Sequence, residues 1–409
     1  MTPADRAREL DAADPLAHVR ERFIDAPAVI SYLDGNSLGR PLRTAQQRLA
    51  EFTEHGWGQR LIRGWTEGWM DWPQVVGDAL GAAALGAVPG QVVIADSTSV
   101  MLYKLARALI ALRPGRRTIV IDTDNFPTDR YIVEGIAGEL DMAVRWIDVD
   151  PESGVHVEQL DAALDEDVAL VLLSHVAYRS AFIADMRAIT ARVHDAGALI
   201  LWDLSHSVGS VPVHLDACSV DAAVGCTYKY LNGGPGAPAF GYLRADLQEQ
   251  VRQPIWGWLG SADPFEMGPG YRPAPGIRRI ISGTPPIISM IPVRAGIELV
   301  AEVGIEAIRE KSIALTSFAI KVVDGWPADL GVRVASPRDP AQRGGHVTIC
   351  RADFRTLTPR LWAEGVIPDF RAPDGIRLGL SPLTTSFTEV LAGLDRIRAS
   401  SSPGRRSLE

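Results

Sequence analysis

Apolar runs and amphipathic stretches alternate through the middle of the chain, between about residue 90 and residue 245. The runs are apolar at nearly every position, as strands are when helices cover both faces of a parallel sheet. Between two of them, Met186–Gly197 has apolar residues at helical spacing and ends on a glycine, which is typical of a helix C-terminus. The pattern predicts an α/β fold in which crossover helices connect parallel strands. The predicted strands are Thr118–Asp122, Ala143–Asp148, Val168–Ser174, Ala198–Asp203 and Ala222–Cys226.

The pattern changes after the predicted sheet. Gln253–Pro286 is rich in proline, glycine and aromatic residues, which predicts a long loop or a crossover between domains. From Ile287 on, a helical region with the amphipathic stretch Ala301–Leu315 precedes short strand-like runs, and this alternation predicts a small α+β domain. We expect residues 1–60 to join this small domain, residues 61–286 to form the large domain, residues 287–409 to complete the small one, and the tail from Ala399 to be frayed. The late strand-like runs are Val332–Ala335, His346–Cys350 and Ile376–Leu380.

Charge and cysteine usage narrow the class of protein. The net charge of −9 and the absence of any basic cluster argue against binding to a nucleic-acid backbone. Cys218, Cys226 and Cys350 lack paired metal-ligand spacing, and their odd number fits a reducing compartment. The sequence has no apolar run of about 18 residues and no signal pattern at its start. These features predict a cytoplasmic protein that binds neither nucleic acid nor a membrane.

Polar side chains gather where the predicted strands end. Ser174 and Asp203 close two of the strands, and Thr227, Tyr228 and Lys229 follow a third. Ligands of open α/β sheets bind beyond the carboxyl ends of the strands. The sequence therefore predicts a ligand site at this edge of the sheet.

Lys229 is the strongest candidate for covalent chemistry. It is one of four lysines, and it lies between an apolar run and a glycine-rich turn, where a desolvated amine can form a Schiff base with a carbonyl. Asp203 on the preceding strand would keep a pyridine nitrogen protonated, which is what a pyridoxal phosphate enzyme requires. We expect the charges of Lys311 and Lys321 to lie on the solvated face of a helix and Lys104 to lie on the surface.

Five other residues are candidates for the site, and most of them have a structural interpretation as well. Thr98 and Ser99 open a helix, where they either form a phosphate cup or cap the helix. Phe126 either stacks on a cofactor ring or fills the core. Arg377, in a strand-like run, either binds a ligand carboxylate or forms a structural salt bridge. His206 would need a third ligand beside Asp203 to hold a metal, and none has suitable spacing, so no metal is expected.

These residues stand in motifs that resemble those of the kynureninase family, which are pyridoxal phosphate hydrolases of fold type I, the aspartate aminotransferase-like fold. The resemblance runs from about residue 30 to residue 395, and motifs of this length in this order are highly specific. The motifs are Tyr32–Gly39, Phe126–Asp129, Trp202–His206, Cys226–Gly236, Gly257–Trp258, Pro269–Gly276, Gly283–Pro286 and Gly375–Arg377.

The resemblance implies a homodimer that cleaves L-kynurenine to anthranilate and L-alanine. Lys229 would carry the cofactor and remove the Cα proton, Asp203 would pair with the pyridine nitrogen, and Tyr228 would relay a proton. The implied cofactor-binding residues are Thr98, Ser99, Phe126, Pro127, Thr128, Asp129, Ser174, Asp203, His206, Tyr228 and Lys229, with Trp258 and Thr284 reaching over from the partner subunit. The implied substrate-binding residues are Arg377, Trp65, Gly283, Thr284 and Asn36.

The chain departs from the animal members of the family at two positions, and three alternative functions stay open. Gln59 stands where animal members of the family have a histidine facing the substrate ring, and Thr284 stands where they have asparagine, so the chain resembles the bacterial, kynurenine-preferring form. The same reaction on a ring-substituted kynurenine is the closest alternative. Another fold-type-I enzyme, such as a cysteine desulfurase or an amino-acid epimerase, is the second alternative. A desulfurase would need a mobile late cysteine, whereas Cys350 lies in a strand-like run. A non-catalytic regulator that binds pyridoxal phosphate would need a nucleic-acid module, for which the chain has no spare length.

Overall fold

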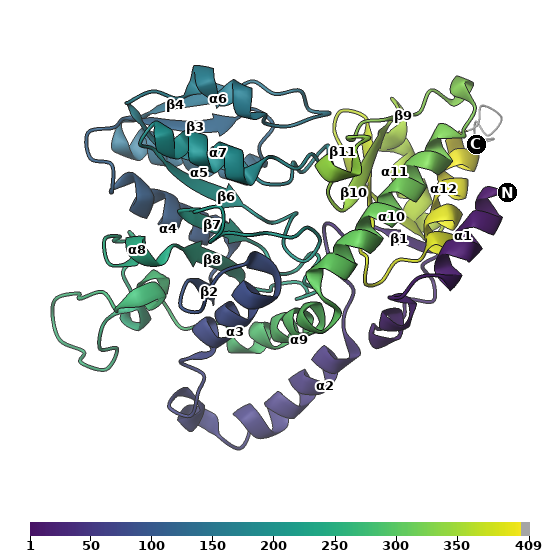
Figure 1. Cartoon of the computed structure of the whole chain (residues 1–409). Coiled ribbons are helices and arrows are strands. Elements are labelled where there is room, and N and C mark those ends of the chain that lie inside the picture. Colours follow the sequence, from purple (N-terminus) through teal and green to yellow (C-terminus); the bar gives the residue numbers. More distant parts are fainter. Residues whose placement is uncertain (402–409) are drawn as a thin grey trace.

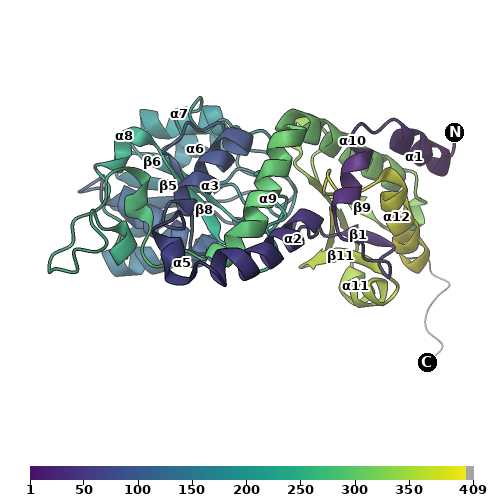
Figure 2. The ribbon, with the colours of Figure 1, turned by 90° about the horizontal axis from the view of Figure 1, so that it is seen from below.

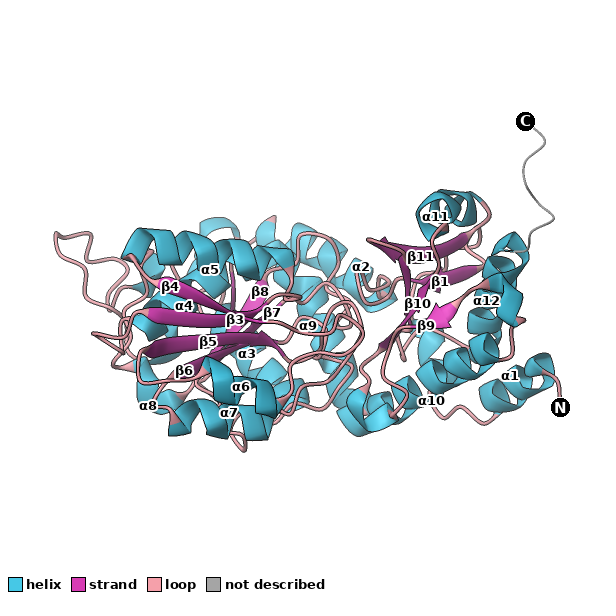
Figure 3. Ribbon diagram, turned by 90° about the horizontal axis from the view of Figure 1, so that it is seen from above, coloured by secondary structure: helices cyan, strands magenta, loops and turns pink. Residues whose placement is uncertain are grey.

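The computed structural model describes residues 1–401 and contains two sheets, each covered by helices. The larger sheet has seven strands in the order β2-β8-β7-β6-β5-β3-β4. Strand β8 is antiparallel to both of its neighbours, and the remaining pairs are parallel. Figure 3 shows this sheet beside the smaller one. The seven strands are β2 (Val92–Ala95), β3 (Thr118–Asp122), β4 (Ala143–Ile147), β5 (Val168–Ser174), β6 (Leu199–Asp203), β7 (Ala222–Gly225) and β8 (Ala239–Leu243).

The apolar runs become central strands because both faces of the sheet are covered. Along β5, Val171 and Leu173 pack into one hydrophobic cluster, while Leu170 and Leu172 pack into the cluster on the other face. One cluster includes residues of α4 (Thr98–Ile110) and α5 (Pro127–Leu140). The other includes residues of α3 (Trp72–Leu80), α6 (Val157–Ala163), α7 (Met186–Asp195) and α9 (Ile287–Val303).

The smaller sheet has five strands in the order β1-β11-β12-β10-β9. Its first strand comes from the N-terminal part of the chain and pairs in parallel with β11, so segments more than 300 residues apart in sequence lie side by side (Figures 1 and 2). The strands are β1 (Ser31–Leu33), β9 (Arg333–Val334), β10 (His346–Cys350), β11 (Val366–Arg371) and β12 (Gly375–Gly379). Helices α1 (Pro3–Ala12), α10 (Ile305–Asp324), α11 (Phe354–Ala363) and α12 (Phe387–Ser401) accompany this sheet.

The expected fold class is confirmed, and all five predicted strands of the large sheet are present. The sequence pattern missed β2 and β8, and it missed β1 and β11 in the small sheet. The predicted stretch Ala301–Leu315 is not one helix, because Gly304 adopts φ +86° and separates α9 from α10. Of the expected frayed tail, Ala399–Ser401 belongs to α12, and the remainder lies outside the described residues.

Between the two sheets, α2 (Arg43–Glu51) runs along α9 (Figure 2). Helix α9 also packs against α3 of the large sheet, whereas α10 packs against α12 and β10 of the small one. The expected division at residues 60 and 286 stays a prediction. Within the described part of the chain, no helix is long and apolar enough to span a membrane.

Two expectations about lysines are wrong. Lys104 is fully buried, with its amine 2.7 Å from the Asp96 carboxylate. The Lys311 side chain is 4 % exposed and forms an ion pair of 2.7 Å with Asp14. Both positions accept a lysine because a carboxylate, Asp96 just before the helix of Lys104 and Asp14 from the N-terminal region for Lys311, compensates for the desolvation of the amine. Lys321 is exposed, as expected.

Candidate active site

The predicted site residues of the large sheet meet at one edge. Ser174 at the end of β5 is in register with Asp203 at the end of β6, and Asp203 is in register with Val224 of β7. Lys229 follows β7 by four residues and is 8 % exposed. The carboxyl ends of three adjacent parallel strands therefore place an alcohol, a carboxylate and a buried amine together.

The Lys229 amine faces an imidazole and two aromatic rings. Its Nζ lies 3.2 Å from Nε2 of His206, 5.9 Å from the centre of the Phe126 ring and 6.0 Å from that of Tyr228. Burial, followed by the positive charges of Lys229 and Arg377, lowers the pKa of His206 well below its usual value. His206 is therefore neutral near pH 7, and one ring nitrogen can accept a hydrogen bond from the lysine.

Two carboxylates complete the buried part of the site. Asp203 is 6 % exposed, and its Oδ1 accepts a hydrogen bond of 2.8 Å from the Ser205 amide. Asp129, in the first turn of α5, is 2 % exposed, and burial together with the Asp203 and Asp122 carboxylates raises its pKa well above the usual value. The Asp129 Oδ2 atom has no hydrogen-bond partner among the described residues. A buried carboxyl oxygen without a protein partner indicates a position where a ligand or water supplies one.

Two helix N-termini point their free amides towards this edge. Helix α4 begins after β2 with Thr98 and Ser99 in its first turn, but Ser97 is the residue that caps it, accepting from the Val100 amide at 3.4 Å. Helix α5 begins after β3 with Pro127 and Thr128, and Phe126 precedes it. The uncapped amides of a helix N-terminus favour a negative group such as a phosphate. Since Ser97 is the cap, the hydroxyls of Thr98 and Ser99 are available to such a group.

Ser174 and Tyr228 are half-buried beside these groups. The Ser174 hydroxyl donates to Oδ1 of Asn125 at 3.1 Å. Burial, followed by the neighbouring Cys226 thiol, raises the pKa of Tyr228. The Tyr228 phenol therefore stays protonated at neutral pH and can donate a hydrogen bond.

Arg377 comes to the site from the small sheet and is 1 % exposed. Its Nε donates to Asp369 on β11 at 2.7 Å, Nη2 also contacts Asp369, and Nη1 lies 3.5 Å from Nε2 of His206. Nη1 also donates to the Tyr178 carbonyl at 2.8 Å, and Nη2 to the Ser37 hydroxyl at 2.9 Å. The structure thus contains the carboxylate partner of the salt-bridge interpretation, and it places the same guanidinium against the Lys229 site.

The N-terminal motif Tyr32–Gly39 contacts the segment that contains Tyr228 and Lys229. The Gly39 amide donates to the Tyr228 carbonyl at 2.8 Å, and a Cβ at Gly39 would lie 2.4 Å from the Lys229 carbonyl oxygen, so the position requires glycine. Asn36 is fully buried against Gly379, and neither atom of its amide has a hydrogen-bond partner within the described chain.

The other predicted site residues, Trp65, Gly283, Thr284 and Trp258, lie outside this buried cluster, and Trp258 lines a different hollow from Trp65 and Thr284. Trp65 and Thr284 line a groove of about 450 Å³, and the Trp65 ring packs edge-on against Trp69 at 5.3 Å between ring centres. Gly283 and Thr284 are exposed, and Trp258 is 39 % exposed. Gln59 is exposed and hydrogen-bonds His55 at 2.8 Å. The groove is mostly apolar, and its other lining residues include Trp57, Leu61, Ile62 and Ile288.

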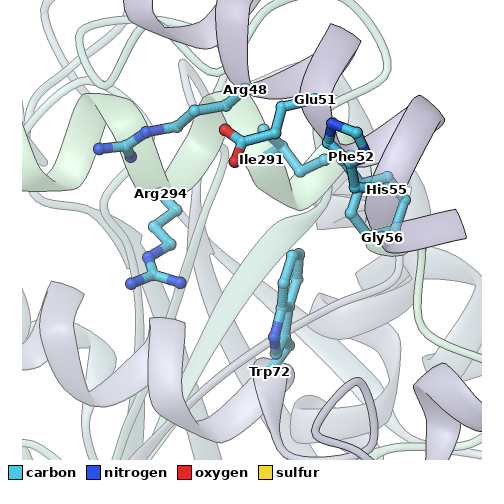
Figure 4. Close-up of a pocket in the computed structure, with 8 residues that line it drawn as sticks. All are labelled: Arg48, Glu51, Phe52, His55, Gly56, Trp72, Ile291 and Arg294. Atoms are coloured by element: carbon cyan, nitrogen blue, oxygen red, sulfur yellow. The ribbon is translucent and has the colours of Figure 1, made fainter. Parts of the chain in front are cut away.

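A neighbouring groove of about 450 Å³ shares Phe52 with the first (Figure 4). Trp72 stands on one side of it, and Arg48 and Arg294 project from α2 and α9. Both guanidinium groups are engaged with Glu298, at 2.6 Å and 2.8 Å. The sequence pattern did not predict this groove.

Sequence reasoning missed Asp369, His346 and Tyr230, which the fold places near Arg377 and His206. The Gly344–Gly345 pair before His346 was the available signal, because two glycines ahead of a buried strand indicate close packing. The described residues contain no cluster of His, Cys, Asp and Glu that could hold a metal ion.

Solved structures with the same fold belong to pyridoxal phosphate enzymes. A cysteine desulfurase from Thermococcus onnurineus superposes with a TM-score of 0.81 over 94 % of this chain and 98 % of its own, at 17 % identity. A C-DES variant with glycine covalently linked to its PLP cofactor superposes with a TM-score of 0.80 over 90 % of this chain and 96 % of its own, at 18 % identity. At sequence identities of 17 % and 18 %, this similarity shows the fold alone.

Sequence relatives identify the family. A kynureninase from Burkholderia pseudomallei is 42 % identical over 405 residues, which cover 97 % of this chain and 95 % of the relative. A kynureninase from Pseudomonas fluorescens is 42 % identical over 396 residues, which cover 95 % and 93 %. Residues 308–397 match the family described as the kynureninase C-terminal domain. The chain therefore belongs to the kynureninase family.

Proposed function

We propose that this protein hydrolyses L-kynurenine to anthranilate and L-alanine with pyridoxal phosphate bound covalently to Lys229. The observation that carries the proposal is the buried Lys229 amine, 3.2 Å from His206 and beside Asp203, in a chain 42 % identical to kynureninases over 97 % of its length. Purified protein should release anthranilate, which is measured by its fluorescence. A protein that carries the cofactor yet forms no anthranilate would contradict the proposal.

The residues at the sheet edge fit this cofactor. The amides and hydroxyls at the start of α4 suit its phosphate, with Thr98, Ser99 and Tyr228 as the side chains that would hold it. Asp203 supplies a carboxylate for the pyridine nitrogen, and Phe126 supplies a ring face. Pro127, Thr128, Asp129, Ser174 and His206 would complete the surroundings, and the unpartnered Asp129 Oδ2 is a polar contact that a bound group can use. When bound, pyridoxal phosphate supplies an electron sink for the bonds at the substrate Cα and Cβ.

The proposed roles of the protein groups follow from their charge and position. The Asp203 carboxylate would pair with the pyridine nitrogen and favour its protonated form. The Lys229 amine takes the proton from the substrate Cα, and neutral His206 orients that amine by accepting a hydrogen bond. One water is consumed when it adds to the aryl ketone, and Tyr228 is the proposed proton relay because its phenol stays protonated.

Arg377 is proposed to bind the substrate α-carboxylate, with Asp369 holding the guanidinium in place. Arg377→Ala should weaken substrate binding by about 2–5 kcal/mol, because a buried carboxylate would lose its charged partner. Arg377→Lys should recover only part of this, since an ammonium cannot form the planar two-point contact. The measurement is KM for L-kynurenine, with melting temperature recorded in parallel. An unchanged KM together with a lowered melting temperature would assign Arg377 a purely structural salt bridge.

The predicted site residues outside the buried cluster are proposed to act across a homodimer. Trp258 and Thr284 would reach the partner's cofactor, and Trp65, Gly283 and Thr284 would line the pocket for the substrate ring, with Asn36 also in contact with substrate. The supporting observation is the apolar groove that Trp65 and Thr284 share, rimmed by exposed Trp57, Leu61 and Ile62. A contiguous apolar surface of this kind is typical of a protein interface.

Gln59 bears on the proposed substrate preference. Gln59 is exposed and engaged with His55, so a 3-hydroxyl on the substrate ring meets no dedicated partner from this position. A buried hydroxyl without a hydrogen bond costs about 1–3 kcal/mol. We therefore expect kcat/KM for L-kynurenine to exceed that for 3-hydroxykynurenine by at least about tenfold. Equal or reversed values would favour a ring-substituted kynurenine as the natural substrate.

A desulfurase-like activity is disfavoured although the fold neighbours include desulfurases. Cys350 is 6 % exposed within β10, and burial raises its pKa to about 12. A buried thiol that stays protonated is a poor nucleophile.

The absence of disulfides among the described cysteines supports our further proposal of a cytoplasmic location.

A further inference from the structure

Lys104 carries a buried charge for which the roles above have no use. It lies near the start of α4, its side chain is fully buried, and its amine forms an ion pair of 2.7 Å with the Asp96 carboxylate. The neighbouring residues Met101, Leu102 and Leu105 are buried and apolar. Burial lowers the pKa of Lys104, and the Asp96 charge opposes that change. The charged state of this amine therefore depends on Asp96.

The position of Lys104 is unfavourable for a cation in two respects. Removing an amine from water costs free energy. The side chain also points back towards the start of α4, since its amine reaches a residue that precedes the helix, and the partial positive charge of a helix N-terminus repels a cation. Buried ion pairs seldom stabilise a fold more than apolar side chains of the same volume do. Stability alone therefore does not account for Lys104, and its partner Asp96 indicates a geometric role.

Asp96 forms the turn that connects β2 with α4. It follows β2 directly and has φ +54°, a left-handed conformation that most residues with a side chain avoid. Its carbonyl accepts a hydrogen bond of 2.9 Å from the Ala239 amide of β8, and its side chain accepts one of 2.7 Å from Lys104. The turn is therefore fixed on one side to the sheet and on the other to α4 itself.

This turn determines the direction of the first residues of α4. Only Ser97, the cap of the helix, separates Asp96 from Thr98 and Ser99. A change of φ at Asp96 would reorient the amides and hydroxyls that follow it. We propose that Lys104 is a positioning residue for phosphate recognition: through its ion pair with Asp96 it holds the turn between β2 and α4, and so directs the first amides and hydroxyls of α4 at the cofactor phosphate. This inference rests on the proposed function, in which that phosphate binds at the start of α4.

The test separates binding of the phosphate from binding of the rest of the cofactor. Full-length protein freed of cofactor is titrated with pyridoxal phosphate and with pyridoxal, which lacks the phosphate, and visible absorbance gives a dissociation constant for each. Lys104→Met keeps an unbranched apolar chain in the same space. Lys311→Met is the matched control, because Lys311 has a buried ion pair of 2.7 Å with Asp14 and lies on α10, which packs against the small sheet. Melting temperatures are recorded in parallel.

We expect Lys104→Met to bind pyridoxal phosphate about tenfold more weakly, the scale of one lost hydrogen bond to a charged group, and to bind pyridoxal within about threefold of wild type. The ratio of the dissociation constant for pyridoxal phosphate to that for pyridoxal should therefore rise. Lys311→Met should lower the melting temperature and leave this ratio unchanged. An unchanged ratio in folded Lys104→Met would overturn the proposal, as would an equal rise of the ratio in Lys311→Met.

If Lys104→Met fails to fold, Asp96→Asn decides. Asparagine tolerates the left-handed conformation and fills the same space, but its neutral amide holds the Lys104 amine less strongly. The same ratio should rise by a smaller factor in Asp96→Asn, and an unchanged ratio there would refute the proposal.

The titrations need no turnover, so they are independent of the proposed reaction. Wild-type protein that binds pyridoxal phosphate but forms no anthranilate would contradict the proposed reaction alone. Wild-type protein that binds pyridoxal phosphate no more tightly than pyridoxal would overturn the phosphate role of α4, and the role of Lys104 with it.

Discussion

Lys229→Ala should abolish anthranilate formation and remove the visible absorbance of the purified protein. The amine is both the expected attachment point of the cofactor and the group that takes the Cα proton, so no neighbouring side chain can replace it. His206, 3.2 Å away, is neutral and cannot form the covalent bond. Borohydride reduction of the wild-type protein followed by peptide mass analysis should locate the added cofactor mass on the peptide that contains Lys229.

Lys321→Ala is the matched control, because Lys321 is exposed on α10. It should retain absorbance and turnover. Lys104 and Lys311 are unsuitable controls, since each is buried in an ion pair and its loss would leave a buried carboxylate without a partner. Cofactor mass on any peptide other than that of Lys229 would show that the assignment is mistaken.

Asp203→Ala should lower kcat by about 10²–10³, the usual effect of removing a preorganised charge from a reacting centre. The ionised carboxylate favours the protonated pyridine nitrogen, and without it the ring accepts electrons less readily. Assays at saturating pyridoxal phosphate separate this effect from weaker cofactor binding. Asp161→Asn serves as control, because Asp161 forms an exposed ion pair with Arg192. A kcat near that of wild type in cofactor-saturated Asp203→Ala would remove Asp203 from the mechanism.

The sequence pattern predicted the central strands well because each is apolar on both faces. Thr118–Asp122 and Val168–Ser174 were predicted with their observed bounds. Strands β1 and β11 escaped notice because β1 has three residues and β11 is only partly buried, so neither has a distinct pattern. The break at Gly304 was missed because the apolar spacing continues on both sides of it.

The candidate site could be predicted where its residues follow strands. Ser174, Asp203 and Lys229 lie at the ends of consecutive parallel strands, and parallel strands bring those ends to one edge. Arg377 was recognised by its motif, but the pattern did not identify Asp369 as its partner. His346 was treated only as a strand residue.

By itself the sequence determined the α/β class, the edge of the sheet that carries the chemistry, and the lysine with a suitable local environment. These depend on the period of apolar residues and on the nearest neighbours in the chain, which the sequence contains directly. Only the tertiary structure decided that Lys104 and Lys311 are buried in ion pairs, that Asp369 holds Arg377, and that His346 lies beside His206. Burial and pairing of charges depend on contacts between segments up to hundreds of residues apart, and no local pattern records them.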